Sequence, residues 1–360
     1  MAVDDPLLGH GRQIIVREDW LGLTEEPALE PAIPIVDPHH HLWERDEGSY
    51  LLPDLLADAA GGHDIRATIF VQCGEMYRAH GPEEEKSLGE TEFVTGVAAV
   101  SASGRHGPTR ACAGIIGMVD LTLGAKVDAL LEAHRAAAGG RFCGIRNRTA
   151  WHPSPDVTSN LVAPPPGPLE NPAFAEGARR LARHGMPLDV WCYHTQLPHA
   201  IALARAVPEL TIVVDHVGGP LGIGPFAGRQ AEVFPEWKQR MQALAALPNV
   251  IVKLGGLTMY VSGFDFHRRP RPPGSEELAR TWRPYIETCL ESFGASRCMF
   301  ESNFPVDKGM CSYTVLWNGL KRLAAGASAA EKTALFSGTA MRVYGLDRLP
   351  SALAVDLTPR

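Results

Sequence analysis

The sequence lacks the features that mark secreted, membrane-spanning and disulfide-rich proteins. Its seven cysteines are scattered with no Cys-x-x-Cys spacing, which argues against a disulfide framework or a structural zinc knuckle. Its longest apolar runs, such as residues 67–71, have the length of a β-strand and are too short for a membrane span. The first residues carry acids where a secretory signal needs basic groups. We therefore expect a reduced, cytoplasmic protein with no membrane partner.

An excess of positive charge is also absent. The chain of 360 residues has a net charge of −7, with 45% apolar and 21% charged residues, which is typical of a globular enzyme and unlike a nucleic-acid binder. No Gly-x-Gly-x-x-Gly motif opens a helix after the first expected strand, so the fingerprint of a dinucleotide-binding fold is missing. We expect a small-molecule partner and no nucleic acid, and the sequence leaves a homodimer open.

The sequence does contain short β-branched runs that alternate with longer segments of helical period. Eight strands are expected, at residues 33–37, 67–72, 113–119, 142–146, 188–192, 211–215, 250–254 and 298–301. Six amphipathic helices are expected, at residues 127–138, 171–184, 196–206, 232–247, 275–293 and 314–325. Buried strands separated by helices predict a single (β/α)8 barrel of the TIM type over residues 33–348, with an N-terminal arm (1–32) and a C-terminal tail (349–360).

The first strand ends in a histidine cluster. Active sites of such barrels form at the C-terminal ends of the strands. Alternation along an extended chain puts His39 and His41 on one side and His40 on the other. Two imidazoles on one side can share a divalent ion such as zinc, iron or manganese, and the alternative is a cluster that only stabilises the loop. We expect a metal site there, with one or two ions.

Three residues after other strands are further candidate metal ligands. His194 follows the fifth strand, and His216 follows the sixth, where a Gly-Gly-Pro turn permits close approach of the backbone to a ligand. Glu75 follows the second strand. Each has a structural alternative, which is a hydrogen-bonded histidine for His194 and His216 and a salt bridge for Glu75.

Carboxylates near the end of the eighth strand are the candidates for proton transfer. A metal-dependent hydrolase needs a carboxylate close to the water that attacks its substrate. Glu301 and Asp307 are suitable, and Asn303 lies between them. An amide can bind a metal through its oxygen, but it cannot act as a base at neutral pH.

Basic and phenolic residues near strand ends are candidates for substrate binding. Arg146 and Arg148 close the fourth strand, and Arg146 suits a carboxylate held by two hydrogen bonds. Tyr193 follows the fifth strand. Arg268 and Arg269 stand in a long loop after the seventh strand, where they could hold a carboxylate or a phosphate, or form a solvated charged run.

Taken in order, these motifs resemble the amidohydrolase superfamily, and within it the amidohydrolase-2 branch of predicted metal-dependent hydrolases, which includes lactonases. The matching stretches, from residue 36 to residue 305, are VDPHHHLW, GIR, VDHVG, VKLGGL and MFESNFP. The resemblance runs from about residue 33 to the closing segment at 340–346. It implies a (β/α)8 barrel, a hydrolytic water, and metal ligation by His39, His41 and His216.

One residue departs from the family pattern. Where family members read Ser-Asp-Trp-Pro, this chain reads Ser-Asn-Phe-Pro, so Asn303 stands in place of the expected metal-binding or general-base aspartate. Either Glu301 or Asp307 takes over the carboxylate role, or the metal site is arranged differently, or catalysis is weakened. No lysine is evident in the fourth strand to form the bridging carbamate of a binuclear site.

The function predicted from these residues is hydrolysis of a carboxylic acid derivative, a lactone or an ester, by metal-activated water, with Arg146 orienting an acidic substrate. A thioesterase acting on acyl-coenzyme A is the alternative, because Arg268 and Arg269 could contact phosphates. A metal-dependent decarboxylase is a third hypothesis. An inactive barrel that serves as a binding protein is a fourth, and it is motivated by Asn303.

Overall fold

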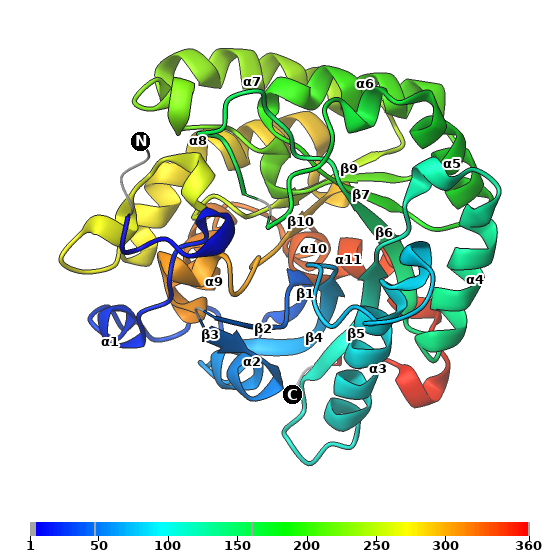
Figure 1. Cartoon of the computed structure of the whole chain (residues 1–360). Coiled ribbons are helices and arrows are strands. Elements are labelled where there is room, and N and C mark those ends of the chain that lie inside the picture. The colour runs from blue at the N-terminus through cyan, green and yellow to red at the C-terminus, as the bar shows by residue number, and fades with distance from the viewer. Residues whose placement is uncertain (1–4, 47, 160, 359–360) are drawn as a thin grey trace.

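The computed structural model describes residues 5–46, 48–159 and 161–358, and its centre is a barrel of parallel strands (Figure 1). Eight strands hydrogen bond in the order β1-β4-β5-β6-β7-β8-β9-β10 and form a nearly closed (β/α)8 barrel. The strands are β1 (Pro34–His40), β4 (Asp64–Val71), β5 (Arg110–Gly117), β6 (Phe142–Arg148), β7 (Leu188–Trp191), β8 (Ile212–Val214), β9 (Val250–Leu254) and β10 (Cys298–Phe300). The eight strands expected from the sequence and the barrel are confirmed.

The barrel closes between β1 and the segment that follows β10. The backbone N–H of His41 donates to the carbonyl of Phe304 at 2.7 Å, and the N–H of Asn303 donates to the carbonyl of His39 at 2.9 Å. A parallel bridge joins His40 and Phe304. These bonds bring the ends of the first and last barrel strands together, so that residues 39–41 lie beside residues 302–304.

Helices surround the barrel. They are α1 (Glu18–Leu21), α2 (Leu52–Ala59), α3 (Leu88–Ala102), α4 (Lys126–Ala137), α5 (Pro172–Arg183), α6 (Leu197–Ala206), α7 (Gln230–Ala245), α8 (Ser275–Phe293), α9 (Tyr313–Leu323), α10 (Ala329–Thr333) and α11 (Thr339–Val343). The six expected helices correspond to α4 to α9, with ends shifted by up to two residues. Among the described residues, no helix has the length and apolar character needed to cross a membrane.

The sequence did not predict α2, α3 or the antiparallel hairpin of β2 (Trp43–Arg45) and β3 (Gly48–Tyr50). Helix α3 buries the consecutive residues 88–91, which lie on different sides of the helix, so its buried residues do not repeat with one clean helical period. The hairpin strands have three residues each, which is too short for an alternating pattern to stand out.

Strand residues alternate between two apolar layers. Ile35 belongs to the large cluster that includes residues of the surrounding helices, and the next residue, Val36, belongs to the smaller cluster inside the barrel with Ile251 and Met299. Tyr344 of the closing segment joins the inner cluster. Both faces of the strands are therefore covered, as the near-continuous apolar runs require.

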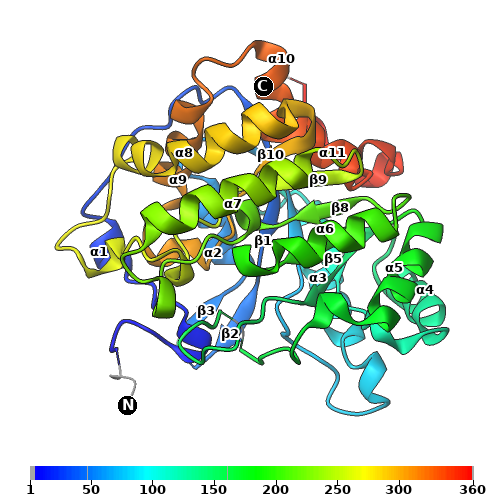
Figure 2. The same ribbon diagram turned by 90° about the horizontal axis from the view of Figure 1, so that it is seen from above.

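The described part of the N-terminal arm begins beside the β2–β3 hairpin and runs past α1 along the side of the barrel toward the end with α10 and the C-terminus (Figure 2). The indole Nε1 of Trp20 donates to the carbonyl of Arg269 at 2.9 Å. The ammonium of Lys321 donates to the carbonyls of Leu29 and Glu30 at 2.8 Å each. The arm is thus fixed at several points along its length.

Candidate active site

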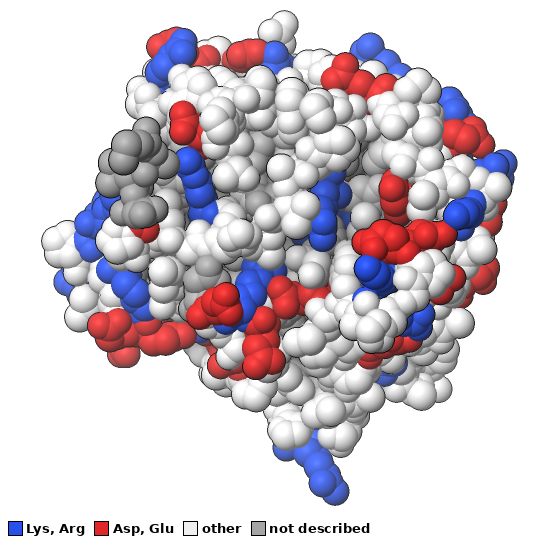
Figure 3. Space-filling view, viewed as in Figure 1, with Lys and Arg blue, Asp and Glu red and all other residues white. Residues whose placement is uncertain are grey.

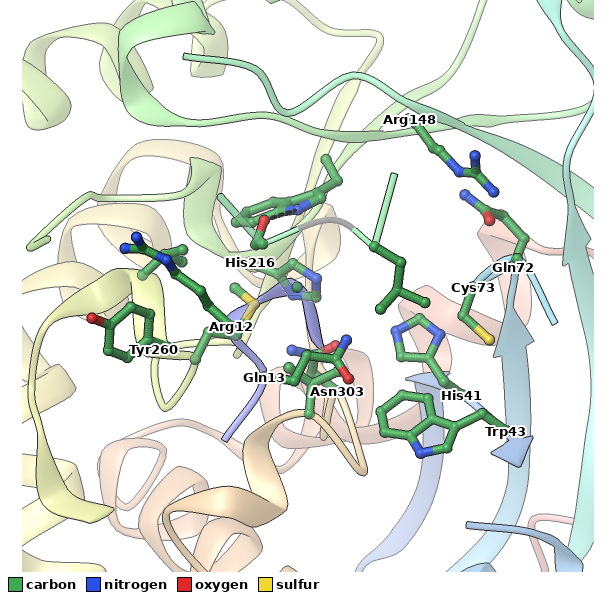
Figure 4. A pocket seen from close by; sticks show the side chains of 18 of the residues that line it. Arg12, Gln13, His41, Trp43, Gln72, Cys73, Arg148, His216, Tyr260 and Asn303 are labelled. Atoms are coloured by element: carbon green, nitrogen blue, oxygen red, sulfur yellow. Dashed lines mark hydrogen bonds between the residues drawn. The ribbon is translucent and has the colours of Figure 1, made fainter. Parts of the chain in front are cut away.

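A cavity of about 150 Å³ opens at the C-terminal ends of the strands, with the first-strand histidines at one side. His41 lines it, His39 lies fully buried beside His41, and their Nε2 atoms are 3.3 Å apart. In Figure 4, His41 and His216 point into the same space, with Trp43 and Asn303 next to them. The wall is made by residues 11–14, His41, Trp43, Arg45, Gln72, Cys73, Gly74, Arg146, Arg148, Ser159, Leu161, Val162, Trp191, His216, residues 259–261, Asn303 and Val306.

The contacts of the two imidazoles determine where their protons lie. The Nδ1 of His41 is 2.7 Å from the carbonyl of Val71, which can only accept, so Nδ1 carries the proton. For His39, a Glu301 oxygen lies 2.8 Å from Nδ1, and a guanidinium nitrogen of Arg146, which can only donate, lies 3.1 Å from Nε2. The Nζ of Lys253, which also can only donate, lies 3.2 Å from the same Nδ1, so Nδ1 has both an acceptor and a donor beside it. With the His39 proton on Nδ1, which ligation through Nε2 requires, both Nε2 atoms carry lone pairs.

These two lone pairs fit a metal ion. Burial lowers the pKa of both His39 and His41 well below the usual value, so both imidazoles are neutral at pH 7. Two nitrogens at zinc–nitrogen distance from one tetrahedral ion are roughly 3.4 Å apart. The observed 3.3 Å between the Nε2 atoms matches that separation. The pair is therefore suited to hold one divalent cation on the side that faces the cavity.

The carboxylate of Glu301 lies close to the imidazole nitrogens of His39 and His216. Among the described residues, the one group of three or more such side chains whose ligand atoms lie within 4.8 Å of one another is His39, His216 and Glu301. His41 is not in that group, but the ring centroid of His39 lies 4.9 Å from that of His41 and 4.5 Å from that of His216. Glu301 Oε1 accepts from both the Nδ1 and the backbone N–H of His216, at 2.7 and 3.1 Å. We therefore interpret Glu301 as the group that orients the two imidazoles, a contact that metal-binding histidines commonly make.

A buried lysine lies beneath the histidines. Lys253 Nζ is 2.5 Å from Asp189, 3.3 Å from Asp215 and 3.2 Å from the Nδ1 of His39, and all four residues are buried. Burial opposes the charge of Lys253, but the carboxylates around it outweigh burial and raise its pKa. Tyr344 donates to Asp189 at 3.0 Å. This network places a permanent positive charge inside the barrel next to the histidines.

Asn303 and Asp307, which follow β10, form a hydrogen-bonded pair. The amide Nδ2 of Asn303 donates to Asp307 at 2.9 Å, and the backbone N–H of Thr258 donates to the other carboxylate oxygen at 3.3 Å. Asn303 reaches the cavity, whereas Asp307 is fully buried behind it. Burial raises the pKa of Asp307 to about 7.

Three predicted site residues lie away from this cluster. Glu75 forms a salt bridge with Arg45 at 2.6 Å, which is the structural alternative to a role in metal binding. His194 accepts from the backbone N–H of Leu221 at 3.2 Å. Tyr193 is buried, and its hydroxyl lies 2.9 Å from that of Ser159. The structure does not bring these side chains to His39 and His41.

The predicted arginines separate into two groups. Arg146 and Arg148 line the cavity, and Arg146 also lies 3.5 Å from Asp215. Arg268 pairs with Asp5 of the N-terminal arm, and Arg269 pairs with Glu277 at 2.6 Å. The loop arginines therefore hold the arm and helix α8, and neither lines the cavity.

Several cavity residues were missed by sequence reasoning. Arg12 and Gln13 come from the arm, which carries no recognisable motif, and Gln72 and Trp191 come from strand ends. Trp43 stands in the quoted first-strand motif and could have been found from that position. On the face drawn in Figure 3, basic side chains lie around the hollow over the barrel.

Comparison with known proteins shows similarity over almost the whole barrel. The amidohydrolase family model matches residues 36–346. The protein y4mH of Sinorhizobium fredii is 30% identical over 334 residues, which cover 87% of this chain and 98% of that protein. An L-fucono-1,5-lactonase of Burkholderia multivorans is 26% identical over 325 residues, 86% of this chain and 96% of the lactonase.

A solved structure resembles the chain as well. An amidohydrolase from Burkholderia multivorans, crystallised with bound zinc, has a TM-score of 0.66 and 26% identity, and the match covers 88% of this chain and 99% of that one. The family match begins at residue 36, so the arm residues that line the cavity precede it.

Proposed function

This chain belongs to the amidohydrolase family, and we propose that it hydrolyses a lactone with the help of a divalent metal ion. The observation that carries the proposal is the pair of buried, neutral imidazoles of His39 and His41, whose Nε2 lone pairs face each other at 3.3 Å beside the cavity. The zinc bound by the similar Burkholderia amidohydrolase supports zinc as the first ion to test. When bound, such an ion supplies Lewis acidity, which polarises an ester carbonyl and makes a nearby water more acidic.

His216 is suited to move the proton of the attacking water. It lines the cavity, and its Nδ1 donates to Glu301, so its Nε2 carries a lone pair. A histidine held by a carboxylate is a common general base near neutral pH. In hydrolysis, the water oxygen bonds to the carbonyl carbon while His216 takes the proton. The ring C–O bond then breaks, and the proton passes to the leaving oxygen, which gives a hydroxy acid.

The cavity wall supports a polar, cyclic substrate whose product is an acid. Trp43 and Trp191 provide flat aromatic surfaces, and Gln13 and Gln72 provide amides that can bind hydroxyl groups. Arg148 lines the cavity without an ion pair among the described residues, so its guanidinium can bind the carboxylate that hydrolysis releases. The L-fucono-1,5-lactonase relatives, at 26% identity, favour a sugar lactone within this class.

A substrate panel tests the proposal. We expect the purified chain, supplied with zinc, to hydrolyse sugar 1,5-lactones faster than linear esters, as measured by proton release with a pH indicator. The double variant His39→Ala with His41→Ala should lose both bound zinc and turnover. Full activity in that variant would overturn the proposed metal site, and turnover of linear esters alone would overturn the lactone assignment.

The other hypotheses have less support. The thioesterase hypothesis rested on Arg268 and Arg269, which are paired with Asp5 and Glu277 and lie outside the cavity. A panel that includes an acyl-coenzyme A thioester and an aromatic carboxylic acid tests the thioesterase and the decarboxylase directly. A chain that binds zinc and turns over none of these compounds would favour the inactive binding protein.

A further inference from the structure

A buried carboxylate behind the cavity wall holds the loop that follows β4. Glu90, in the first turn of α3, is 1% exposed. Its Oε1 accepts from the backbone N–H groups of Cys73, Gly74 and Glu75 at 2.9, 2.8 and 2.9 Å. Cys73 and Gly74 line the cavity, whereas Glu90 does not. One helix side chain thus fixes three consecutive peptide groups at the edge of the candidate site.

Two further contacts dock the same loop on the start of α3. The backbone N–H of Arg78 donates to the carbonyl of Lys86 at 2.9 Å. Gly89 approaches the loop so closely that a Cβ on it would lie 2.4 Å from the carbonyl oxygen of Met76. A residue larger than glycine would therefore push the loop away. The loop 73–78 is built onto this helix, and Glu90 supplies three of the hydrogen bonds between them.

Arg148 packs against this loop. A Cβ built on Gly74 would lie 2.7 Å from the Nη2 of Arg148, so the missing side chain of the glycine leaves room for the guanidinium. Gly74 also has a φ of 85°, in the left-handed region that favours glycine. Arg148 ends β6 and lines the cavity (Figure 4). The position of the Gly74 backbone therefore limits where this guanidinium can lie.

The other arginines of the cavity wall are bound to the protein itself. Arg45 pairs with Glu75 at 2.6 Å, and Arg146 lies 3.5 Å from a buried carboxylate. Arg12 donates to a backbone carbonyl at 2.7 Å. Arg148 has no ion pair among the described residues. It is therefore the wall arginine best suited to bind an anionic group that enters the cavity.

We infer that Glu90 is a positioning residue: by fixing the backbone of Gly74, it places Arg148 where that guanidinium binds the carboxylate released by hydrolysis. The inference rests on the proposed function for the acid product. None of the described residues that line the cavity is an aspartate or a glutamate, so the wall does not repel an anionic product. Glu90 is buried behind the loop, so it orders the guanidinium without competing for it.

Binding of the product without turnover tests the inference. The probe is L-fuconate, the hydroxy acid that L-fucono-1,5-lactone yields, titrated by calorimetry into the zinc-loaded full-length chain. L-Fucitol, the alditol of the same sugar, has no carboxylate and is the neutral counterpart. We expect Arg148→Ala to raise the Kd of L-fuconate by about 10- to 100-fold, the effect of a lost charged hydrogen bond, and to leave that of L-fucitol within about twofold of wild type.

Three further variants test the role of the loop. Glu90→Leu keeps the volume of the side chain but removes the acceptor, and it should raise the Kd of L-fuconate by about tenfold. Glu90→Gln keeps an oxygen for the three N–H groups and should stay within about threefold of wild type. Gly74→Ala should also weaken L-fuconate binding, because the added Cβ displaces the guanidinium of Arg148 directly.

Ser101→Ala is the matched control on the same helix. Ser101 is 2% exposed, accepts from the N–H of Ala111 at 2.9 Å and donates to the carbonyl of Thr109 at 2.9 Å. These contacts lie near the start of β5, at the other end of the barrel, so the Kd of L-fuconate should stay unchanged. In the double variant Glu90→Leu with Arg148→Ala, L-fuconate should bind no more weakly than to Arg148→Ala alone.

The possible outcomes are distinguishable. A wild-type chain that neither hydrolyses the lactones of the panel nor binds L-fuconate would overturn the proposed function and this inference together. Lactone turnover with an unchanged L-fuconate Kd in Glu90→Leu would overturn this inference alone. Equal losses of L-fuconate and L-fucitol binding would show a general distortion of the cavity, which contradicts it, and so would additive losses in the double variant.

Glu90→Asp keeps the inference testable should Glu90→Leu fail to fold. The shorter side chain withdraws the carboxylate from the three N–H groups, so L-fuconate binding should weaken while L-fucitol binding stays the same. An unchanged Kd of L-fuconate in a folded Glu90→Asp chain would contradict the positioning role.

Discussion

At the scale of single residues, the site depends on how each imidazole is oriented by its second nitrogen. Glu301 contacts the Nδ1 of both His39 and His216, at 2.8 and 2.7 Å. Spacing in the sequence predicted that His39 and His41 share one side of the strand. It could not predict which carboxylate meets the Nδ1 atoms, because the residues in contact are far apart in the chain; His216 and Glu301, for example, are separated by 85 residues.

Removing the charge of Glu301 should therefore impair the site without changing its shape. We expect Glu301→Gln to lower kcat by about 10- to 100-fold, because an orienting partner of this kind contributes that much to metal affinity or activity. Steady-state kinetics with the best lactone of the panel would measure the effect, and circular dichroism would verify the fold. Activity equal to wild type would show that Glu301 does not orient the histidines during turnover.

At the scale of secondary-structure elements, the barrel strands were predictable and the elements around the cavity were not. Apolar, β-branched runs identify buried strands such as β9 directly. The N-terminal arm has no such apolar run, yet its residues 11–14 form part of the cavity wall. Its position is set by contacts far apart in sequence, such as that between Trp20 and the carbonyl of Arg269.

Gln13 tests whether the arm takes part in substrate binding. Its side chain lines the cavity and accepts from Arg45 at 2.9 Å. We expect Gln13→Ala to raise KM for the lactone by about tenfold, the effect of one lost hydrogen bond, while kcat and zinc content stay unchanged. Arg271→Ala, which removes an arm contact to Leu23 away from the cavity, is the control. An unaltered KM in Gln13→Ala would exclude this residue from substrate binding.

A buried ion-pair network on three neighbouring strands leads to an expected number of metal ions. Asp189 on β7, Asp215 after β8 and Lys253 on β9 form a buried ion-pair network. Lys253 supplies the positive charge that a second cation would bring to these carboxylates, so we expect one zinc per chain. Elemental analysis after gel filtration in zinc-free buffer measures the ratio. Two zinc ions per chain would contradict the role given to Lys253.

At the scale of the whole molecule, several histidines are buried in their neutral form. Burial lowers the pKa of His40 to about 3 and those of His63, His134 and His194 to about 4. In the unfolded chain these groups titrate near 6.5, so the unfolded state binds more protons between pH 6.5 and pH 4. Their contribution to stability is present above pH 6.5 and is lost as the pH falls through that window. The raised pKa values of Asp37 and Asp307, about 6 and about 7, oppose this trend.

His134 isolates the histidine contribution, because it lies on α4 away from the active site. It is fully buried and contacts the hydroxyls of Thr91 and Ser87 at 2.8 and 3.3 Å. We expect the wild type to lose up to ~3 kcal/mol more than His134→Gln in the free energy of unfolding between pH 7 and pH 4. Urea unfolding at both pH values gives the difference. Equal losses in the two proteins would mean that His134 is not held neutral by burial.

We propose that one cation lies between the Nε2 atoms of His39 and His41 on the side of the cavity. Anomalous scattering from crystals grown with zinc locates the ion directly. We expect a single peak within bonding distance of both Nε2 atoms. A peak enclosed by Glu301 and the Nδ1 atoms of His39 and His216, or no peak at all, would contradict it.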